Sequence, residues 1–218
     1  FAGSGSVNAG AAAVTLQAPQ TVAAIGSVQA LTTTGVLTLT PGAGAVPALS
    51  PLEIGGSLSL TGGSLNDSGV IAALGGNVTL TATSGDVVLA PRADISATGS
   101  HIVLFDLADD APGGTVKLIA TSGNVTIDTG ATVDVAATGN GFAGSLTIQT
   151  PGTATLGGTF LGDGAFGDLG GNFTLNAGSL AGSLPLNGGF SGSFNVTLQQ
   201  GDITIASGTN LNSGKVIL

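Results

Sequence analysis

Apolar and polar residues alternate along most of this chain, in short runs that each begin with glycine. One such run is Gly76-Asn77-Val78-Thr79-Leu80, in which the apolar residues fall on one side and the polar residues on the other. Similar runs begin at residues 56, 85, 114, 123, 144, 171, 201 and 214. Because alternation with a period of two is typical of β-strands, the sequence predicts an all-β protein built from many short strands.

The distance between equivalent runs indicates how the strands are arranged. Leu60 and Leu80 are 20 residues apart, and Leu80 and Leu118 are 38 apart, which we interpret as two turns of 19. Residues 83–89 match residues 121–127 across the same 38 positions. A stack of coils requires a nearly constant repeat, whereas hairpin loops vary freely. We therefore expect a parallel β-helix, or β-solenoid, with about 20 residues per coil and roughly 11 coils.

The whole chain, residues 1–218, is expected to form a single β-solenoid segment. Three prolines interrupt the alternation in residues 41–53, where we expect a loop or cap insertion. Helices are not expected, because glycine and β-branched residues interrupt every stretch. A β-sandwich is the alternative fold, since alternating strands alone do not distinguish it from a solenoid.

The composition narrows the classes of function. The chain has 12 acidic residues, three Lys or Arg and one His, for a formal net charge of −9, and it contains no Cys, Met, Trp or Tyr. Without cysteine, the chain forms no disulfide, thiolate nucleophile or iron–sulfur cluster. With so few cations, we expect no binding of nucleic acid and no insertion into a membrane. Only 7% of the residues are charged, which suits an extracellular β-protein whose surface is built from Thr, Ser and Asn.

Two segments carry a resemblance to a known family. Residues 75–82 (GGNVTLTA) and 123–135 (GNVTIDTGATVDV) resemble coils of the filamentous haemagglutinin-like exoproteins, the large adhesins of two-partner secretion. The resemblance extends over most of residues 54–218 and is shared with autotransporter passengers. It implies a right-handed parallel β-helix, secretion across a Gram-negative outer membrane, and a role in adhesion or biofilms. The Asn-Pro-Asn motif of that family's secretion domain is absent, so the chain is similar to a stalk region and no binding residue is carried over.

Two carboxylates in a glycine-rich stretch suggest a metal site. Asp163 and Asp168 lie within residues 162–171, and carboxylate oxygens are ligands that calcium prefers. Calcium takes about 6–8 oxygen ligands, however, and this stretch offers only these two carboxylates. We therefore expect a structural turn without a metal or cofactor, with calcium at Asp163 and Asp168 as the alternative.

A second group of polar residues surrounds the only histidine. Asp106, Asp109 and Asp110 precede a Pro-Gly-Gly turn and are expected to form a solvated loop. His101 has no second histidine or cysteine with which to form a common zinc site. A Ser/His/Asp arrangement is formally available through His101 and Asp106, but the abundance of serine makes that match uninformative.

If the chain were an enzyme, we would expect it to cleave polysaccharides, because parallel β-helices host lyases and hydrolases with clustered carboxylates. The remaining acids are spread singly along the sequence and are not expected to converge on one stripe; they include Asp86, Asp94, Asp128, Asp134 and Asp202. We therefore expect no enzymatic activity and predict no catalytic residue.

Phenylalanine and threonine are expected to have structural roles. Six of the eight phenylalanines lie in the second half of the chain and are predicted to stack inside the core: Phe142, Phe160, Phe166, Phe173, Phe190 and Phe194. Without Trp or Tyr, an aromatic platform for sugar binding is not expected. Rows of outward Thr resemble those that order water in ice-binding proteins, but Lys117 and Val88 interrupt them, and β-propensity explains these threonines.

These observations together predict a secreted structural or adhesive protein at the bacterial cell surface. Its β-helical stalk would carry contact loops at residues 99–113 and 157–171, and its partners would be neighbouring regions of a longer chain and host or bacterial surface ligands. The alternative is a filament subunit that binds itself end to end, with Val216, Ile217 and Leu218 at one end. An enzyme acting on polysaccharides is a distant alternative.

Overall fold

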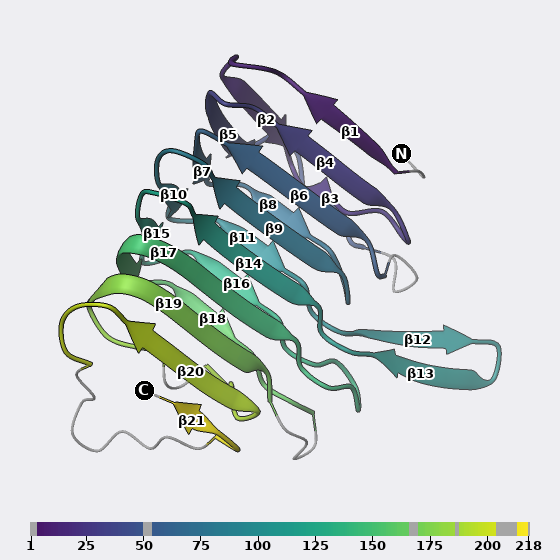
Figure 1. Ribbon diagram of the computed structural model, residues 1–218. Coiled ribbons are helices and arrows are strands. Elements are labelled where there is room, and N and C mark those ends of the chain that lie inside the picture. Colours follow the sequence, from purple (N-terminus) through teal and green to yellow (C-terminus); the bar gives the residue numbers. More distant parts are fainter. Residues whose placement is uncertain (1–3, 50–53, 166–169, 186–187, 204–212, 218) are drawn as a thin grey trace.

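A computed structural model describes residues 4–49, 54–165, 170–185, 188–203 and 213–217 of the chain (Figure 1). Within these residues the protein is all-β, with 21 strands and no helix. Strand pairing is parallel except in one hairpin, whereas a β-sandwich is built from antiparallel pairs. The prediction of an all-β protein with parallel strands is therefore confirmed.

The longest ladder of parallel strands forms the broad front of the molecule in Figure 1. Its strands, in spatial order, are β1 (Gly5–Asn8), β4 (Val28–Thr32), β6 (Ser57–Gly62), β9 (Asn77–Ala82), β14 (Thr115–Ala120), β17 (Ser145–Leu156), β19 (Asn172–Ala181), β20 (Ser193–Leu198) and β21 (Val216–Ile217). Each strand pairs with the next in a parallel register. We call this the front ladder.

Two further parallel ladders follow. The second ladder contains β2 (Val14–Ala18), β5 (Val36–Pro41), β7 (Ser64–Asp67), β10 (Val87–Leu89) and β15 (Val125–Ile127), and continues into the second halves of β17 and β19. The third contains β3 (Thr21–Val22), β8 (Val70–Ala72), β11 (Asp94–Ser96), β16 (Thr132–Asp134) and β18 (Thr159–Leu161). Between β5 and β6 the described residues, 42–49 and 54–56, form no strand, and β3 pairs directly with β8.

In the passes that contain a strand of each ladder, the chain visits the three ladders in turn and then returns to the front ladder one strand further on. The return takes 20 residues between the paired Ser57 and Asn77 and 30 between Thr115 and Ser145. The interpretation of the 38-residue spacing as two turns is wrong, because Leu80 pairs directly with Leu118. That single step is long because it contains the hairpin of β12 (Ser100–Leu104) and β13 (Leu107–Ala111).

Inward-facing side chains stack in rows along the ladders, because paired residues of parallel strands point to the same side. One such row in the front ladder is Leu60, Leu80, Leu118, Ile148 and Leu175, all of them buried. The same alternation that predicts strands from the sequence therefore also identifies the core. Each row removes apolar surface from water continuously along the stack, which stabilises neighbouring passes of the chain together.

A column of glycines explains why the alternating runs begin with glycine. Gly76, Gly114 and Gly144 lie just before β9, β14 and β17, at the bend into the front ladder. A Cβ atom on Gly114 would lie 1.9 Å from the carbonyl oxygen of Gly76, and one on Gly144 would lie 1.9 Å from that of Gly114. Backbones approach too closely at this bend for any side chain, so the repeat requires glycine here.

The predicted phenylalanine stack is confirmed in its centre and wrong at one position. The ring of Phe173 stacks on that of Phe194, with centroids 4.7 Å apart, and lies 5.5 Å from Phe190 and 6.5 Å from Phe160. These four side chains are buried, whereas Phe142 is 63% exposed because it lies in the loop between β16 and β17. Phe166 lies outside the described residues.

Candidate functional site

One hairpin projects sideways from the ladders (Figure 1). Strands β12 and β13 pair antiparallel, and Phe105 and Asp106 form the turn between them. The side chains near the turn are apolar and exposed: Val103 is 58% exposed, Phe105 101% and Leu107 69%. Exposed apolar side chains grouped on a projecting element are typical of a contact with a partner, and the hairpin falls within the predicted contact loop 99–113.

Asp110 anchors the base of this hairpin. Its carboxylate contacts Nδ1 of His101 on the paired strand and accepts a hydrogen bond of 2.7 Å from the backbone N–H of Asn140. The hydrogen bond from Asn140, followed by that with His101, lowers the pKa of Asp110. The structure therefore pairs His101 with Asp110 and not with Asp106, which lies at the exposed turn. The arrangement through Asp106 that the sequence formally allows is not formed, because antiparallel pairing places Asp110 opposite His101.

Three carboxylates lie closer together than their spacing in the sequence suggests. Asp94 on β11 and Asp134 on β16 occupy adjacent strands of the third ladder. The charge of Asp94 raises the pKa of both Asp67 and Asp134, after the larger effect of burial on each of them. Asp94 is the register partner of Thr132 and Asp134 that of Ser96, so these acids do not share one row of the ladder, in agreement with the expectation, although the 38-residue step brings β11 and β16 side by side.

Asp67 is the functional candidate that sequence reasoning missed. Its side chain is fully buried, and it lies in register between Leu39 and Leu89 in the second ladder. Oδ1 accepts a hydrogen bond of 2.8 Å from the backbone N–H of Gly69, whereas Oδ2 has no hydrogen-bond partner among the residues that the structure describes. Burial raises the pKa of Asp67 to about 7. Alternation from the inward Leu65 would have identified Asp67 as an inward position.

The remaining predicted acidic site is described only in part. The side chain of Asp163 is exposed, and Asp168 lies outside the described residues. Among the residues that the structure describes, no group of three or more His, Cys, Asp or Glu is arranged to hold a metal ion. Calcium at Asp163 and Asp168 stays a prediction. Of the second contact loop, 157–171, the structure describes residues 157–165 and 170–171, and these include the short strand β18.

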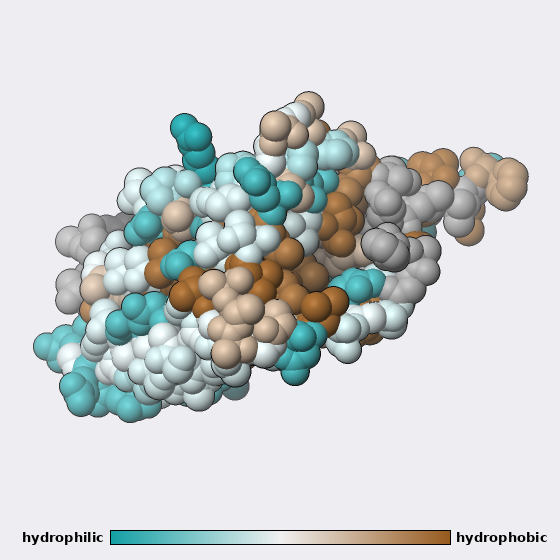
Figure 2. Space-filling view, turned by 90° about the horizontal axis from the view of Figure 1, so that it is seen from above, coloured by the Kyte–Doolittle hydropathy of each residue, from teal (hydrophilic) through white to brown (hydrophobic). Residues whose placement is uncertain are grey.

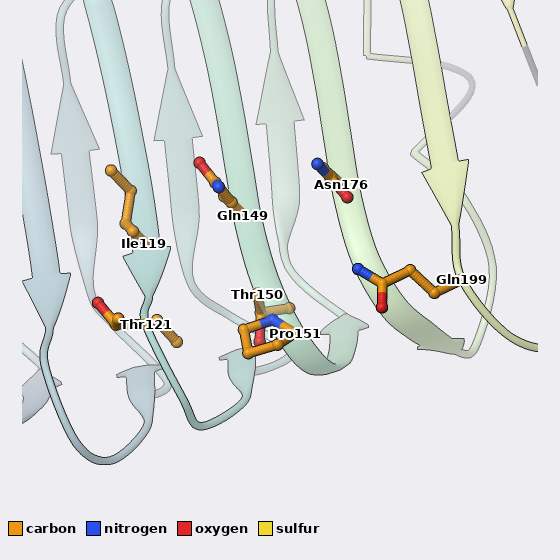
Figure 3. A pocket seen from close by; sticks show the side chains of 8 residues that line it. Ile119, Thr121, Gln149, Thr150, Pro151, Asn176 and Gln199 are labelled. Atoms are coloured by element: carbon orange, nitrogen blue, oxygen red, sulfur yellow. The ribbon is translucent and has the colours of Figure 1, made fainter.

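A hollow of about 240 Å³ opens on the outside of the front ladder (Figure 3). It lies where β14, β17, β19 and β20 end or bend, and it is lined by Ile119, Ala120, Thr121, Gln149, Thr150, Pro151, Asn176 and Gln199. The register of β17 with β19 shifts between Thr150 and Thr153, so the strand bends beside the hollow. The lining carries amide and hydroxyl groups and no charged side chain.

A larger hollow of about 690 Å³ lies at the end of the molecule that contains β1. Leu16, Val22, Leu49 and Leu58 line it, and Oε1 of Gln20 beside them is buried and has no hydrogen-bond partner in the described part of the chain. Seen from this end, apolar side chains gather in the middle of the surface (Figure 2). The core is therefore open to solvent at this end of the described chain.

Comparisons with known proteins give no further identification. No family model, curated protein or solved structure matches the chain. Within the described residues, the structure contains no helix of the length and apolar character needed to cross a membrane.

Proposed function

We propose that the three ladders form a right-handed parallel β-helix and that the chain is a β-helical segment of a secreted, cell-surface structural or adhesive protein. The observation that carries this proposal is the front ladder of nine parallel strands in the described residues, reached once in every pass of the chain. Crossovers between parallel strands are right-handed in about 98% of cases, which supports the handedness. The resemblance of residues 75–82 and 123–135 to adhesin coils supports the function.

Stacked passes contact only their neighbours, so they build a stiff support that extends in one direction. A support of this kind tolerates insertions at its bends, and the hairpin β12–β13 is such an insertion. Residues 98–113 lie between Ala97 and Gly114, where the preceding pass has only Leu74 and Gly75 between Ala73 and Gly76. The insertion carries an apolar tip away from the ladders, and we assign to it the contact with another cell surface.

The test replaces residues 98–113 with Leu-Gly, the linker of the preceding pass. Beads coated with the purified wild-type chain are expected to adhere to bacterial or epithelial cells, and beads coated with the variant are expected to lose most of that adhesion. The variant should keep its far-ultraviolet circular dichroism spectrum, because the ladders on both sides of the hairpin remain. Equal adhesion of a folded variant would contradict the role of the hairpin, and absence of adhesion by the wild-type chain would contradict the adhesive function.

Exposed apolar residues at both ends of the front ladder favour a second candidate, a subunit that stacks end to end. Val7 on β1 is 61% exposed and Val28 on β4 is 55% exposed, while Val216 and Ile217 on β21 are 38% and 44% exposed. A strand edge with apolar side chains pairs readily with another strand. Sedimentation of the chain over a hundredfold range of concentration separates the candidates, because only the filament subunit would form longer particles as the concentration rises.

A further inference from the structure

The outer surface of the front ladder is polar and almost uncharged. From β6 through β9, β14, β17, β19 and β20, the outward positions carry Ser, Thr, Asn and Gln, with one Lys and one Ile. Their middle row, in which each residue is the register partner of the next, is Ser59, Thr79, Lys117, Thr147, Thr174 and Asn195. Neighbouring members of such a row are about 4.8 Å apart.

The hollow in Figure 3 lies at the end of the next row on this surface. Gln149 on β17 and Asn176 on β19 are register partners, and Gln199 follows the end of β20. These three amide side chains surround the hollow together with Pro151. Two of them, Gln149 and Asn176, come from adjacent strands, so the backbone positions that carry them are about 4.8 Å apart.

The amides of Gln149 and Asn176 make fewer hydrogen bonds than the row of outward side chains at the start of the same strands. There, the hydroxyls of Thr115 and Ser145 lie 3.2 Å apart, and Ser193 donates a hydrogen bond of 2.7 Å to Asn172. By contrast, the side chains of Gln149 and Asn176 are exposed and hydrogen-bond to no group in the described part of the chain. Their donors and acceptors are therefore available to a ligand.

The backbone holds the hollow in a fixed shape. Pro151 has no N–H, and it lies at the register shift of β17, where a strand tolerates proline. A Cβ atom on Gly178 would lie 2.0 Å from the carbonyl oxygen of Pro151, so glycine is required where β19 passes this bend. A site that is already shaped loses little conformational freedom when it binds a ligand.

The chemistry of this surface selects one class of ligand. An amide group offers both donors and an acceptor, as a hydroxyl does, so amide rows suit a polymer that carries many hydroxyls. The hollow has no carboxylate for a cation, and the net charge of −9 disfavours an anionic polymer. We infer that the hollow lined by Gln149, Asn176 and Gln199 binds a neutral polysaccharide chain, which lies across the strands of the front ladder. This inference goes beyond the proposed function and does not depend on the hairpin.

The test measures binding of neutral hexasaccharides by titration calorimetry, with cellohexaose, maltohexaose and chitohexaose as probes and a heparin hexasaccharide as the anionic comparison. The wild-type chain is expected to bind at least one neutral probe and not the anionic one. The double variant Gln149→Glu/Asn176→Asp keeps the side-chain shapes but removes amide donors, and we expect its affinity to fall about tenfold or more, as two lost hydrogen bonds imply.

A matched control carries the same two substitutions elsewhere. Gln17→Glu/Asn8→Asp changes the net charge equally at exposed positions of β2 and β1, and it should bind within twofold of wild type. Should the first double variant fail to fold, the single variant Asn176→Ala is used, with an expected loss of about threefold.

Three results would overturn the inference: no binding of any neutral probe, a preference for the anionic probe, or equal affinities of the hollow variant and the control. The variant without residues 98–113 should bind the probes as the wild type does. Retained sugar binding in a chain that does not adhere to cells would count against the proposed function alone, and adhesion without sugar binding would count against this inference alone.

Discussion

Asp67 occupies a position that the other passes of the chain fill with leucine or isoleucine. Its register partners are Leu39 and Leu89, and Ile127 follows Leu89 in the same row. Burial removes water from the carboxylate of Asp67, and one of its oxygens has no hydrogen-bond partner in the described residues. Both conditions disfavour the charged form, and burial is the main cause of the raised pKa. The residue therefore couples the stability of the core to pH.

The free energy of unfolding is therefore expected to depend on pH. The pKa of Asp67 is about 7 in the folded chain against an ordinary 3.8, so as the pH falls from above 7 to about 4 the folded state binds a proton before the unfolded state does. The free energy of unfolding should rise over that interval, and Asp94 and Asp134, whose pKa values burial also raises, act in the same direction. A pKa of about 7 corresponds to at most about 4 kcal/mol for Asp67.

Asp67→Asn should remove most of this dependence and stabilise the chain at pH 8, since the amide keeps the acceptor for Gly69. Urea unfolding of both proteins at pH 5 and pH 8 measures the effect. Asp202→Asn, at an exposed position, is the matched control and should retain the wild-type pH dependence. An Asp67→Asn chain as sensitive to pH as wild type would refute the assignment.

Asp67 also shows what sequence can predict about single residues. The alternation that identifies Leu65 as an inward residue extends two positions further to Asp67, so its burial was accessible from the pattern. Its pKa was not, because that depends on how completely neighbouring passes exclude water. The pairing of His101 with Asp110 likewise depends on the antiparallel register of a hairpin, which their spacing alone does not specify.

At the scale of elements, the alternating runs predicted eight strands of the front and second ladders and the rows of the core that these strands form. The sequence did not reveal the hairpin β12–β13. It lies between two passes of similar sequence, so a constant repeat interprets the spacing across it as an additional turn. The hairpin makes one step 38 residues long and thereby places Asp94 and Asp134 on adjacent strands.

The second prediction tests the glycine column at the bend into the front ladder. Gly114→Ala places a Cβ atom 1.9 Å from the carbonyl oxygen of Gly76, so the backbones must separate and the free energy of unfolding should fall by roughly 2–4 kcal/mol. Gly5→Ala is the matched control, because a Cβ atom there meets only the side chain of Gln29, at 3.6 Å. The control should change stability by less than about 0.5 kcal/mol. Equal melting temperatures for the two variants would contradict the close approach of the backbones.

At the scale of the whole molecule, one geometric relation determines the architecture: equivalent residues of successive passes lie one strand apart. Because of this relation, equivalent residues line up to form the rows of the core, the glycine column and the polar outer surface. The sequence predicted the relation but overestimated the number of passes, because insertions lengthen several of them. The front ladder has nine strands in the described residues, against roughly 11 coils expected from a constant repeat of about 20.

Distances between spin labels test this relation directly, since a chain without cysteine accepts labels only where cysteine is introduced. Ser59→Cys is combined in turn with Thr147→Cys, Thr174→Cys and Asn195→Cys, which lie three, four and five strands away in the register of the front ladder. At about 4.8 Å per strand, the backbone separations are about 14, 19 and 24 Å. Pulsed electron paramagnetic resonance should show mean label distances that increase in this order by about 5 Å per strand. Distances that do not increase in this order would contradict the stacked parallel ladder.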